Sequence, residues 1–191
     1  MRTPLEDRVV TISRVNSTLT YPCNFMLIAS MNPCACGYYG SKDKECTCTP
    51  QSIAKYMGKI SGPLLDRIDI HIEVTPVKYK KLQDDSKIES SEVVKRRVNE
   101  ARKLQMERYK KYNLYSNSEL TPKLIEEYCK LDSISHKILQ NAFDKLGLSA
   151  RAYGRILKVA RTIADLDHKE NIESKHIAEA IQYRSLDRKY F

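Results

Sequence analysis

The sequence contains no long hydrophobic stretch, and this absence excludes a first class of protein. None of its apolar runs reaches the roughly 18 residues that a membrane-spanning helix requires, so no membrane partner is expected. The N-terminal residues also lack the apolar segment of a secretion signal. No Ser-His-Asp order or Cys-His pairing indicates a nucleophilic hydrolase. We therefore expect a cytoplasmic protein without such a hydrolase site.

Charge, in contrast, is abundant and biased toward one sign. Charged residues make up 30% of the chain and hydrophobic residues 41%, as in soluble globular proteins, and the net charge is +9. The basic excess is densest within residues 78–119. Such a segment favours nucleic acid or another polyanion, but a solvated helix rich in lysine and arginine has the same composition.

The first part of the chain, up to about residue 76, has the pattern of a β-structure. Its expected elements are a hairpin over residues 9–21, a buried strand over 25–29 and an alternating half-buried or edge strand over 68–74. His71 of the last strand could face solvent and is interpreted as an ordinary surface or half-buried histidine. A hairpin and two strands cannot cover both faces of a sheet, so we expect other chain segments to complete this part.

Beyond about residue 90 the hydrophobic period changes to that of helices. The long basic helix is expected over residues 91–111. Capping residues and helix breakers predict four shorter helices. The first begins at Thr121-Pro122, and the second runs from residue 135 until Gly147 stops it. The third follows the N-cap Ser149 and runs to about residue 166, and the fourth follows the N-cap Ser174 and runs to about residue 184. This part is expected to be a compact all-α bundle.

Four of the six cysteines lie close together in the sequence. They form two Cys-x-Cys pairs: Cys34, Cys36, Cys46 and Cys48. Without a secretion signal, metal ligation explains such a cluster better than disulfides do, and four thiolates suit a structural, tetrahedral zinc ion. The alternative is four unligated thiols on a polar loop. Cys23 and Cys129 stand apart and are interpreted as packing residues.

Asn32 is a candidate ligand-binding residue because it follows the end of the expected buried strand. Open α/β sheets bind ligands at the carboxyl ends of their strands. A neutral amide at that position can orient a water molecule or touch a phosphate. An Asx turn before Pro33 is the alternative explanation.

Three arginines are further candidates. Arg67 precedes the expected edge strand, from which it could reach the nucleotide of a neighbouring subunit, or it could simply pair with Asp66 or Asp69. Arg151 lies in the first turn of a helix, where the helix dipole disfavours a cation, so a phosphate or a nearby acid is expected as its partner. Arg155 lies one turn further on the same face and could share that role.

The order of these motifs resembles the magnesium-chelatase-like AAA+ ATPases, and most closely their ComM/YifB branch. The resemblance rests on the hairpin and apolar strand, on Ala-Ser-Met-Asn-Pro at 29–33, on Ser-Gly-Pro-Leu-Leu-Asp-Arg-Ile-Asp at 61–69, on Leu-Ser-Ala-Arg-Ala-Tyr at 148–153 and on the ending at 180–188. It implies the α/β remnant of an AAA+ P-loop core, with a hairpin plus two strands, followed by an all-α helical lid bundle.

The resemblance also implies roles and domains. Asn32 would be the sensor-1 residue, Arg67 the arginine finger, and Arg151 the sensor-2 arginine, with ATP and magnesium as cofactors and a ring of identical subunits as the assembly. The hairpin would be the insertion that faces the central pore in related hexameric helicases. The implied domains are the end of the AAA+ core with its four-cysteine loop (1–76), a linker with the long basic helix (77–118), and the lid (119–191).

The sequence departs from the family pattern in one important respect. No Gly-x-x-x-x-Gly-Lys-Ser/Thr loop and no strand ending in paired acids occur within these residues. Without backbone amides and a lysine to cradle phosphates, ATP affinity is expected to be poor. We therefore predict that the chain alone has no ATPase activity, although the full-length protein would be an ATPase.

Three functions remain open. The first is part of a motor that moves or remodels DNA, for example by unwinding or branch migration. The second is the ATPase subunit of a metal chelatase, although the clustered cysteines and the Leu-Ser-Ala-Arg motif favour the ComM branch. The third is a non-enzymatic, zinc-bearing module that binds nucleic acid or protein, which predicts salt-sensitive DNA binding by the chain itself.

Overall fold

The computed structural model describes residues 2–77 and 89–184, which fall into two compact units divided between Ile68 and Asp69. The first unit contains helix α1 (Arg2–Asp7), strands β1 (Val9–Arg14) and β2 (Ser17–Pro22), and helices α2 (Pro50–Met57) and α3 (Gly62–Leu65). The second contains only helices in its described part: α5 (Ser91–Arg108), η1 (Lys110–Tyr112), η2 (Asn117–Glu119), α6 (Pro122–Tyr128), α7 (Ser133–Leu146), α8 (Ala150–Leu166) and α9 (Ser174–Gln182).

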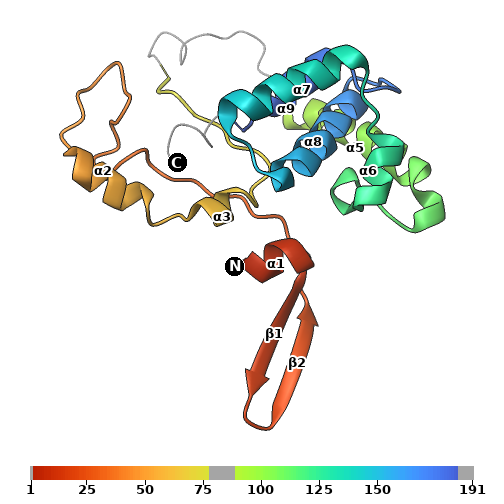
Figure 1. Cartoon of the computed structure of the whole chain (residues 1–191), viewed down its shortest axis with the longest axis horizontal. Helices are drawn as coiled ribbons and strands as arrows, with labels where there is room; N and C mark the ends of the chain where they lie inside the picture. The colour runs from red at the N-terminus through yellow and green to blue at the C-terminus, as the bar shows by residue number, and fades with distance from the viewer. Residues whose placement is uncertain (1, 78–88, 185–191) are drawn as a thin grey trace. The chain divides into compact units, whose positions relative to one another are not determined.

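The predicted hairpin is present as a two-stranded antiparallel ribbon with α1 at its base (Figure 1). Hydroxyl side chains pair across the strands, with the oxygens of Thr11 and Thr20 3.1 Å apart and those of Ser13 and Thr18 also 3.1 Å apart. Both faces of the ribbon are largely exposed to solvent. Cross-strand pairs and ladder hydrogen bonds therefore hold the hairpin, and it buries no core of its own.

The two further strands expected from the sequence do not form in the described residues. Residues 23–32 and 69–77 contain no strand, and their apolar side chains point into solvent: Met26 is 83% exposed, Ile28 84% and Val74 86%. A strand needs a neighbour for its backbone N–H and C=O groups, and the described residues provide no pairing strand for these segments. The prediction of a hairpin followed by a helical region is confirmed, but the two strands are not present.

Local signals place the helices close to where the sequence predicts them. The hydroxyl of Ser149 accepts a hydrogen bond from the Ala152 N–H and begins α8, and Pro122 opens α6. Gly147 ends α7 in the left-handed conformation, with φ at 62°, which glycine adopts without steric cost. The last helix differs in one detail, because its N-cap is Glu173 and Ser174 is already helical.

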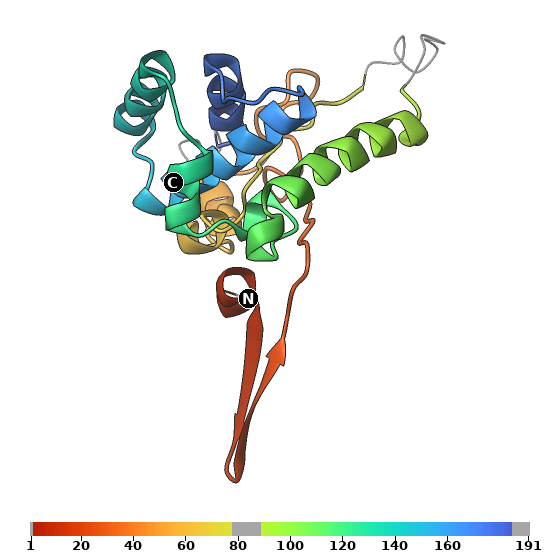
Figure 2. The same ribbon diagram turned by 90° about the vertical axis from the view of Figure 1, so that its right-hand side faces the viewer.

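The helical unit is built around α8, which contacts α5, α6 and α9. Its core consists of buried apolar side chains from several helices and their connections: Tyr109, Leu120, Leu124, Cys129, Leu139, Ile156, Leu157, Ala160, Ala164, Ile172, Ile177 and Ala180. Figure 2 shows α5 extending beyond the other helices, and its residues 91–100 are all exposed. The buried residues of α5, Ala101 and Gln105, both lie in its second half.

His71 is more buried than the sequence pattern indicates. It was interpreted as a surface or half-buried histidine of an edge strand, and it is only 8% exposed. Its backbone N–H donates to the carbonyl of Tyr183, 2.9 Å away, just after α9. A backbone hydrogen bond thus joins the segment that carries His71 to the end of the helical unit.

Candidate functional site

The four clustered cysteines converge in space. All four Sγ atoms lie within 4.8 Å of one another. The Cys34 sulfur is 3.3 Å from that of Cys36 and 3.7 Å from that of Cys46, and the Cys36 and Cys46 sulfurs are 3.5 Å apart. Cys34 is completely buried and the other three are half-buried. These four residues could hold a metal ion, as the sequence predicts.

The electrostatics of the cluster favour a bound cation. A hydrogen bond from the Tyr38 backbone N–H lowers the pKa of Cys36 to about 5. The backbone N–H of Cys48 acts in the same sense on Cys46, but burial and the neighbouring sulfurs outweigh it and raise the pKa of that thiol to about 12. Four crowded thiolates repel one another, and a divalent cation among them removes that repulsion.

Asn32 lies two residues before the first of these cysteines. It is exposed, in a segment without regular secondary structure. The predicted position at the end of a paired strand is therefore not formed within this chain. Its side chain is accessible to solvent.

Arg67 follows α3 and is held within the first unit. Its guanidinium forms an ion pair with Glu6 of α1 and donates to the carbonyl of Pro63. Only 10% of its side chain is exposed, so the local fold turns this arginine inward. The sequence suggested Asp66 or Asp69 as its structural partner, whereas the observed carboxylate comes from the beginning of the chain.

Arg151 and Arg155 lie at the beginning of α8 in the helical unit. Arg151 is the second residue of the helix and is exposed. Arg155, one turn further on, forms an ion pair with Asp69, which precedes the helices in the same unit. The structure therefore brings these two arginines together on one helix, while Asn32 and Arg67 belong to the other unit.

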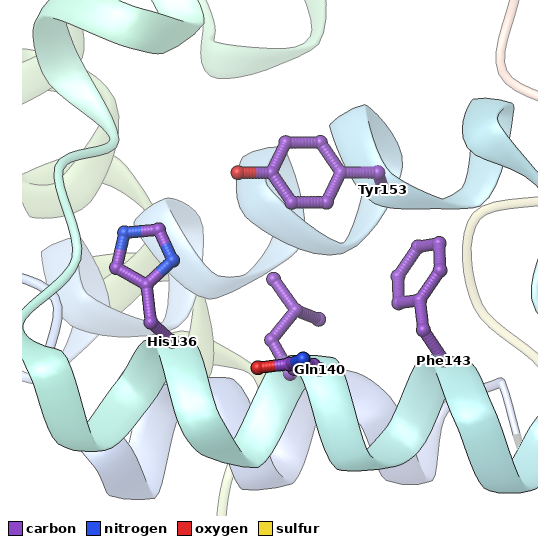
Figure 3. A pocket seen from close by; sticks show the side chains of 5 residues that line it. His136, Gln140, Phe143 and Tyr153 are labelled. Atoms are coloured by element: carbon purple, nitrogen blue, oxygen red, sulfur yellow. The ribbon is translucent and has the colours of Figure 1, made fainter.

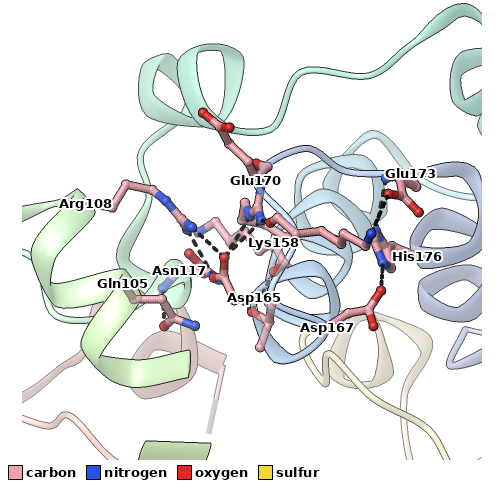
Figure 4. Close-up of polar contacts among 12 residues, drawn as sticks. Gln105, Arg108, Asn117, Lys158, Asp165, Asp167, Glu170, Glu173 and His176 are labelled. Carbon is pink, nitrogen blue, oxygen red and sulfur yellow. Dashed lines mark hydrogen bonds and ion pairs between the residues drawn. The ribbon is translucent and has the colours of Figure 1, made fainter. Parts of the chain in front are cut away.

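A buried polar network, not among the predicted site residues, joins α5 to α8 (Figure 4). The Asp165 carboxylate, completely buried, accepts hydrogen bonds from both terminal nitrogens of Arg108 at 2.6 and 3.1 Å. It also accepts from Arg161 Nε at 3.1 Å and from the Asn117 side-chain amide at 2.8 Å. The phenol of Tyr109 donates to Asn117 at 2.7 Å. Two guanidinium groups thus neutralise one buried carboxylate and connect the two helices.

The signal for this network was present in the sequence. Arg161 and Asp165 are four residues apart and occupy the same stripe of α8 as Leu157 and Ala164. A charged pair within an apolar stripe indicates an internal ion pair. Its third member, Arg108, lies 57 residues from Asp165, and no local pattern could have identified it.

A hollow of about 360 Å³ lies between α7 and α8 (Figure 3). His136, Leu139, Gln140 and Phe143 of α7 line it together with Tyr153 of α8, and the two aromatic rings meet edge to face with centroids 5.9 Å apart. None of the site residues predicted from the sequence contributes to its lining.

Two family models match this chain. The model described as magnesium chelatase, subunit ChlI, matches residues 1–82, and the model of the ChlI C-terminal region matches residues 88–184. The boundary between them falls in the same part of the chain as the predicted change from β to helical patterning. The chain therefore belongs to the magnesium-chelatase-like family.

Comparison with similar proteins assigns the chain to one branch of this family. The chain is 44% identical to competence protein ComM of Haemophilus influenzae over 190 residues, which are 98% of this chain and 36% of ComM. It is 40% identical to YifB of Escherichia coli, with the same coverage, and 31% identical to a Mycobacterium tuberculosis protein over 184 residues. These matches place the chain in the ComM/YifB branch.

The matches differ in how much of each protein they cover. They cover almost the whole of this chain but only 36% of the length of each relative.

No helix in the described part combines the length and apolar composition needed to cross a bilayer.

Proposed function

We propose that this chain is the nucleotide-sensing part of an ATP-driven motor of the ComM type. The observation that carries the proposal is the pair of guanidinium groups at the beginning of α8, in a chain of the magnesium-chelatase-like family. Arg151 is exposed in the first turn, where backbone N–H groups already favour an anion. A phosphate group placed there would meet both the helix terminus and a cationic side chain.

The remaining site residues take complementary roles in this proposal. Asn32 would orient the attacking water or contact the γ-phosphate. Arg67 would act on the nucleotide of a neighbouring subunit in a ring of identical chains, where a guanidinium stabilises the charge that spreads over the transferred phosphoryl group. To do so it must exchange its ion pair with Glu6 for that nucleotide. The helices after residue 119 would form the lid, and the motor would work in the cytoplasm.

The proposed cofactors are ATP and magnesium for the motor and zinc for the four cysteines. Magnesium is bound by oxygen ligands and by the phosphates themselves, so it would accompany ATP. Thiolates select softer ions, and zinc is the common one with four cysteine ligands. The residues that would cradle ATP do not occur in this sequence.

DNA is the proposed substrate. The hairpin presents exposed apolar side chains along its length, with Ile12 48%, Leu19 52% and Tyr21 50% exposed. The exposed half of α5 carries the cationic side chains Lys95, Arg96 and Arg97, the last of which forms an ion pair with Glu89. These cations suit contact with a polyanion, and the name of ComM links that relative to competence.

Replacing the matching segment of ComM by this chain tests the motor proposal. We expect the chimera to hydrolyse ATP and the 191-residue chain alone to be inactive. In the chimera, Arg151→Ala should lower kcat at least about tenfold, because it removes a charge-assisted contact to phosphate. Lys137→Ala, an exposed cation on α7, is the matched control and should leave kcat unchanged. Turnover by the isolated chain, or equal kcat in both variants, would overturn the proposal.

A salt titration separates the motor from a zinc-bearing binding module. A module that binds DNA by itself should bind as the isolated chain and weaken steeply as salt rises from 50 to 200 mM. The motor proposal expects weak binding by the isolated chain at both concentrations. Tight, salt-sensitive binding by the isolated chain would favour the module.

A further inference from the structure

The loop between Asn32 and α2 has almost no apolar interior. Within residues 33–49 only Cys34 is fully buried. The tyrosines of the loop, Tyr38 and Tyr39, are 38% and 43% exposed. Its hydrogen bonds between backbone groups form two tight turns, from Gly37 N–H to the Cys34 carbonyl and from Ser41 N–H to the Tyr38 carbonyl. Ordering a loop of this length carries an entropy cost that these contacts do not offset.

The positions of the four sulfur atoms indicate that coordination of a metal ion could stabilise this loop. In a tetrahedral zinc site with Zn–S bonds of about 2.3 Å, neighbouring sulfurs lie about 3.8 Å apart. The separations of 3.3, 3.5 and 3.7 Å among the sulfurs of Cys34, Cys36 and Cys46 approach this value, and all four sulfurs lie within 4.8 Å of one another. That span suits a single ion.

The surroundings of the sulfurs suit a thiolate site that is closed to substrate. The backbone N–H of Tyr39 donates to Cys34, and those of Tyr38 and Thr47 donate to Cys36. These donors disperse the negative charge that four thiolates keep after binding a dication. With all four coordination positions supplied by cysteine, the ion has a structural role.

We propose that Cys34, Cys36, Cys46 and Cys48 bind one zinc ion and that the loop folds only when they do, so that the metal replaces a hydrophobic core. The proposal rests on the zinc assignment in the proposed function and extends it to the folding of the chain. Metal binding and folding are one event where the protein has no preformed site without the metal. The loop would then be a separate folding unit within a chain whose helices need no metal.

The coupling between metal binding and folding would affect the segments on both sides of the loop. The first ligand lies two residues after Asn32, and the last lies directly before Thr49, whose hydroxyl caps α2 by accepting from the Ser52 N–H at 3.2 Å. One ion would therefore tie the segment that carries Asn32 to the beginning of α2. Removal of the ion should release both ends of the loop.

The test uses the whole 191-residue chain, purified without chelator. Its bound metals are quantified, the site is reloaded with Co²⁺ for absorption spectroscopy, and hydrogen exchange is followed with and without zinc. Cys48→Ser removes one half-buried ligand, and Cys23→Ser is the matched control because Cys23 is also half-buried but outside the cluster. Circular dichroism of both variants verifies that the helical unit remains folded.

We expect one zinc ion per chain in the wild type and in Cys23→Ser, and much less in Cys48→Ser. Co²⁺ should show the intense sulfur-to-metal absorption and tetrahedral bands of a thiolate site. Removing zinc should speed exchange at the Gly37 and Ser41 amides by at least about tenfold and leave the helical unit unchanged. A chain that binds no zinc, or binds iron instead, would overturn the metal assignment. Zinc binding with equal exchange in both states would overturn only the coupling to folding.

Discussion

The two units of the molecule are stabilised by different kinds of interaction. The helical unit buries apolar side chains from several helices around α8 and neutralises its buried carboxylate internally. Among residues 3–68, only Cys34 and Met57 are buried. Apolar burial is the main stabilising contribution to folding, so the helical unit should be stable by itself. The first unit depends on strand pairing and, as we propose, on metal binding.

Removing the buried carboxylate should be the most damaging single change to the helical unit. Asp165→Ala leaves Arg161 and Arg108 without their shared partner, and breaking a buried ion pair from one side destabilises a protein by about 3–5 kcal/mol. Urea denaturation followed by far-UV circular dichroism measures the loss. Asp144→Ala, on the exposed side of α7, is the control and should change stability by less than about 0.5 kcal/mol. Equal effects would show that the network contributes little.

A truncation in each unit tests whether they differ as described. Ile156 is 1% exposed in the core of the helical unit, and Ile156→Ala should destabilise that unit by about 2–5 kcal/mol. Met57→Ala, in the first unit, should leave the denaturation midpoint of the helices unchanged. A shift of that midpoint by Met57→Ala would contradict the independence of the helical unit.

Two glycines in the helical unit should respond in opposite directions to the same substitution. Gly147 has a φ of 62° with nothing within 4 Å of an added Cβ, so Gly147→Ala should destabilise by about 1 kcal/mol through backbone strain alone. Gly154 is inside α8, where an added Cβ would meet Ile125 at an ordinary 3.5 Å, and Gly154→Ala should stabilise by about 0.5–1 kcal/mol. Thermal unfolding gives the Tm of both variants. If both substitutions shifted the Tm in the same direction, this account would be contradicted.

The smallest expected effect concerns acid stability. Hydrogen bonds from Lys175 and His176 lower the pKa of Asp167 to about 2 from its usual 3.8. Since the folded-state pKa is the lower one, this contribution is present above about pH 4 and is lost as the pH falls toward 2. The difference in Tm between wild type and Asp167→Asn should therefore shrink over that interval. A constant difference would show that the carboxylate charge contributes nothing.

The helices were predictable because their signals are local. Ser149, Pro122 and Gly147 act on the residues beside them, and the structure places helix boundaries at each. The four-cysteine cluster was predictable for the same reason, since its ligands lie within one short loop. Local patterns therefore located the four-cysteine cluster and most of the helical unit.

The failures share a physical cause. The segments containing Met26 and Val74 have the patterns of strands, but a strand forms only where a neighbour accepts its hydrogen bonds. The partner of Arg67 also lies far away in the sequence, at Glu6, as does that of Arg108, at Asp165. Pairing between distant segments is not encoded in the periodicity of either segment alone.

The exposed apolar segment at residues 25–28 has a consequence for the lifetime of the protein in a cell. Chaperones and proteases recognise extended chain with uncovered hydrophobic side chains, and Met26 and Ile28 present such a surface. Copies in which this segment is uncovered would be bound or degraded, whereas copies in which it is covered would survive. The steady-state abundance of the chain would therefore rise with the fraction of copies in which residues 25–28 are shielded from solvent.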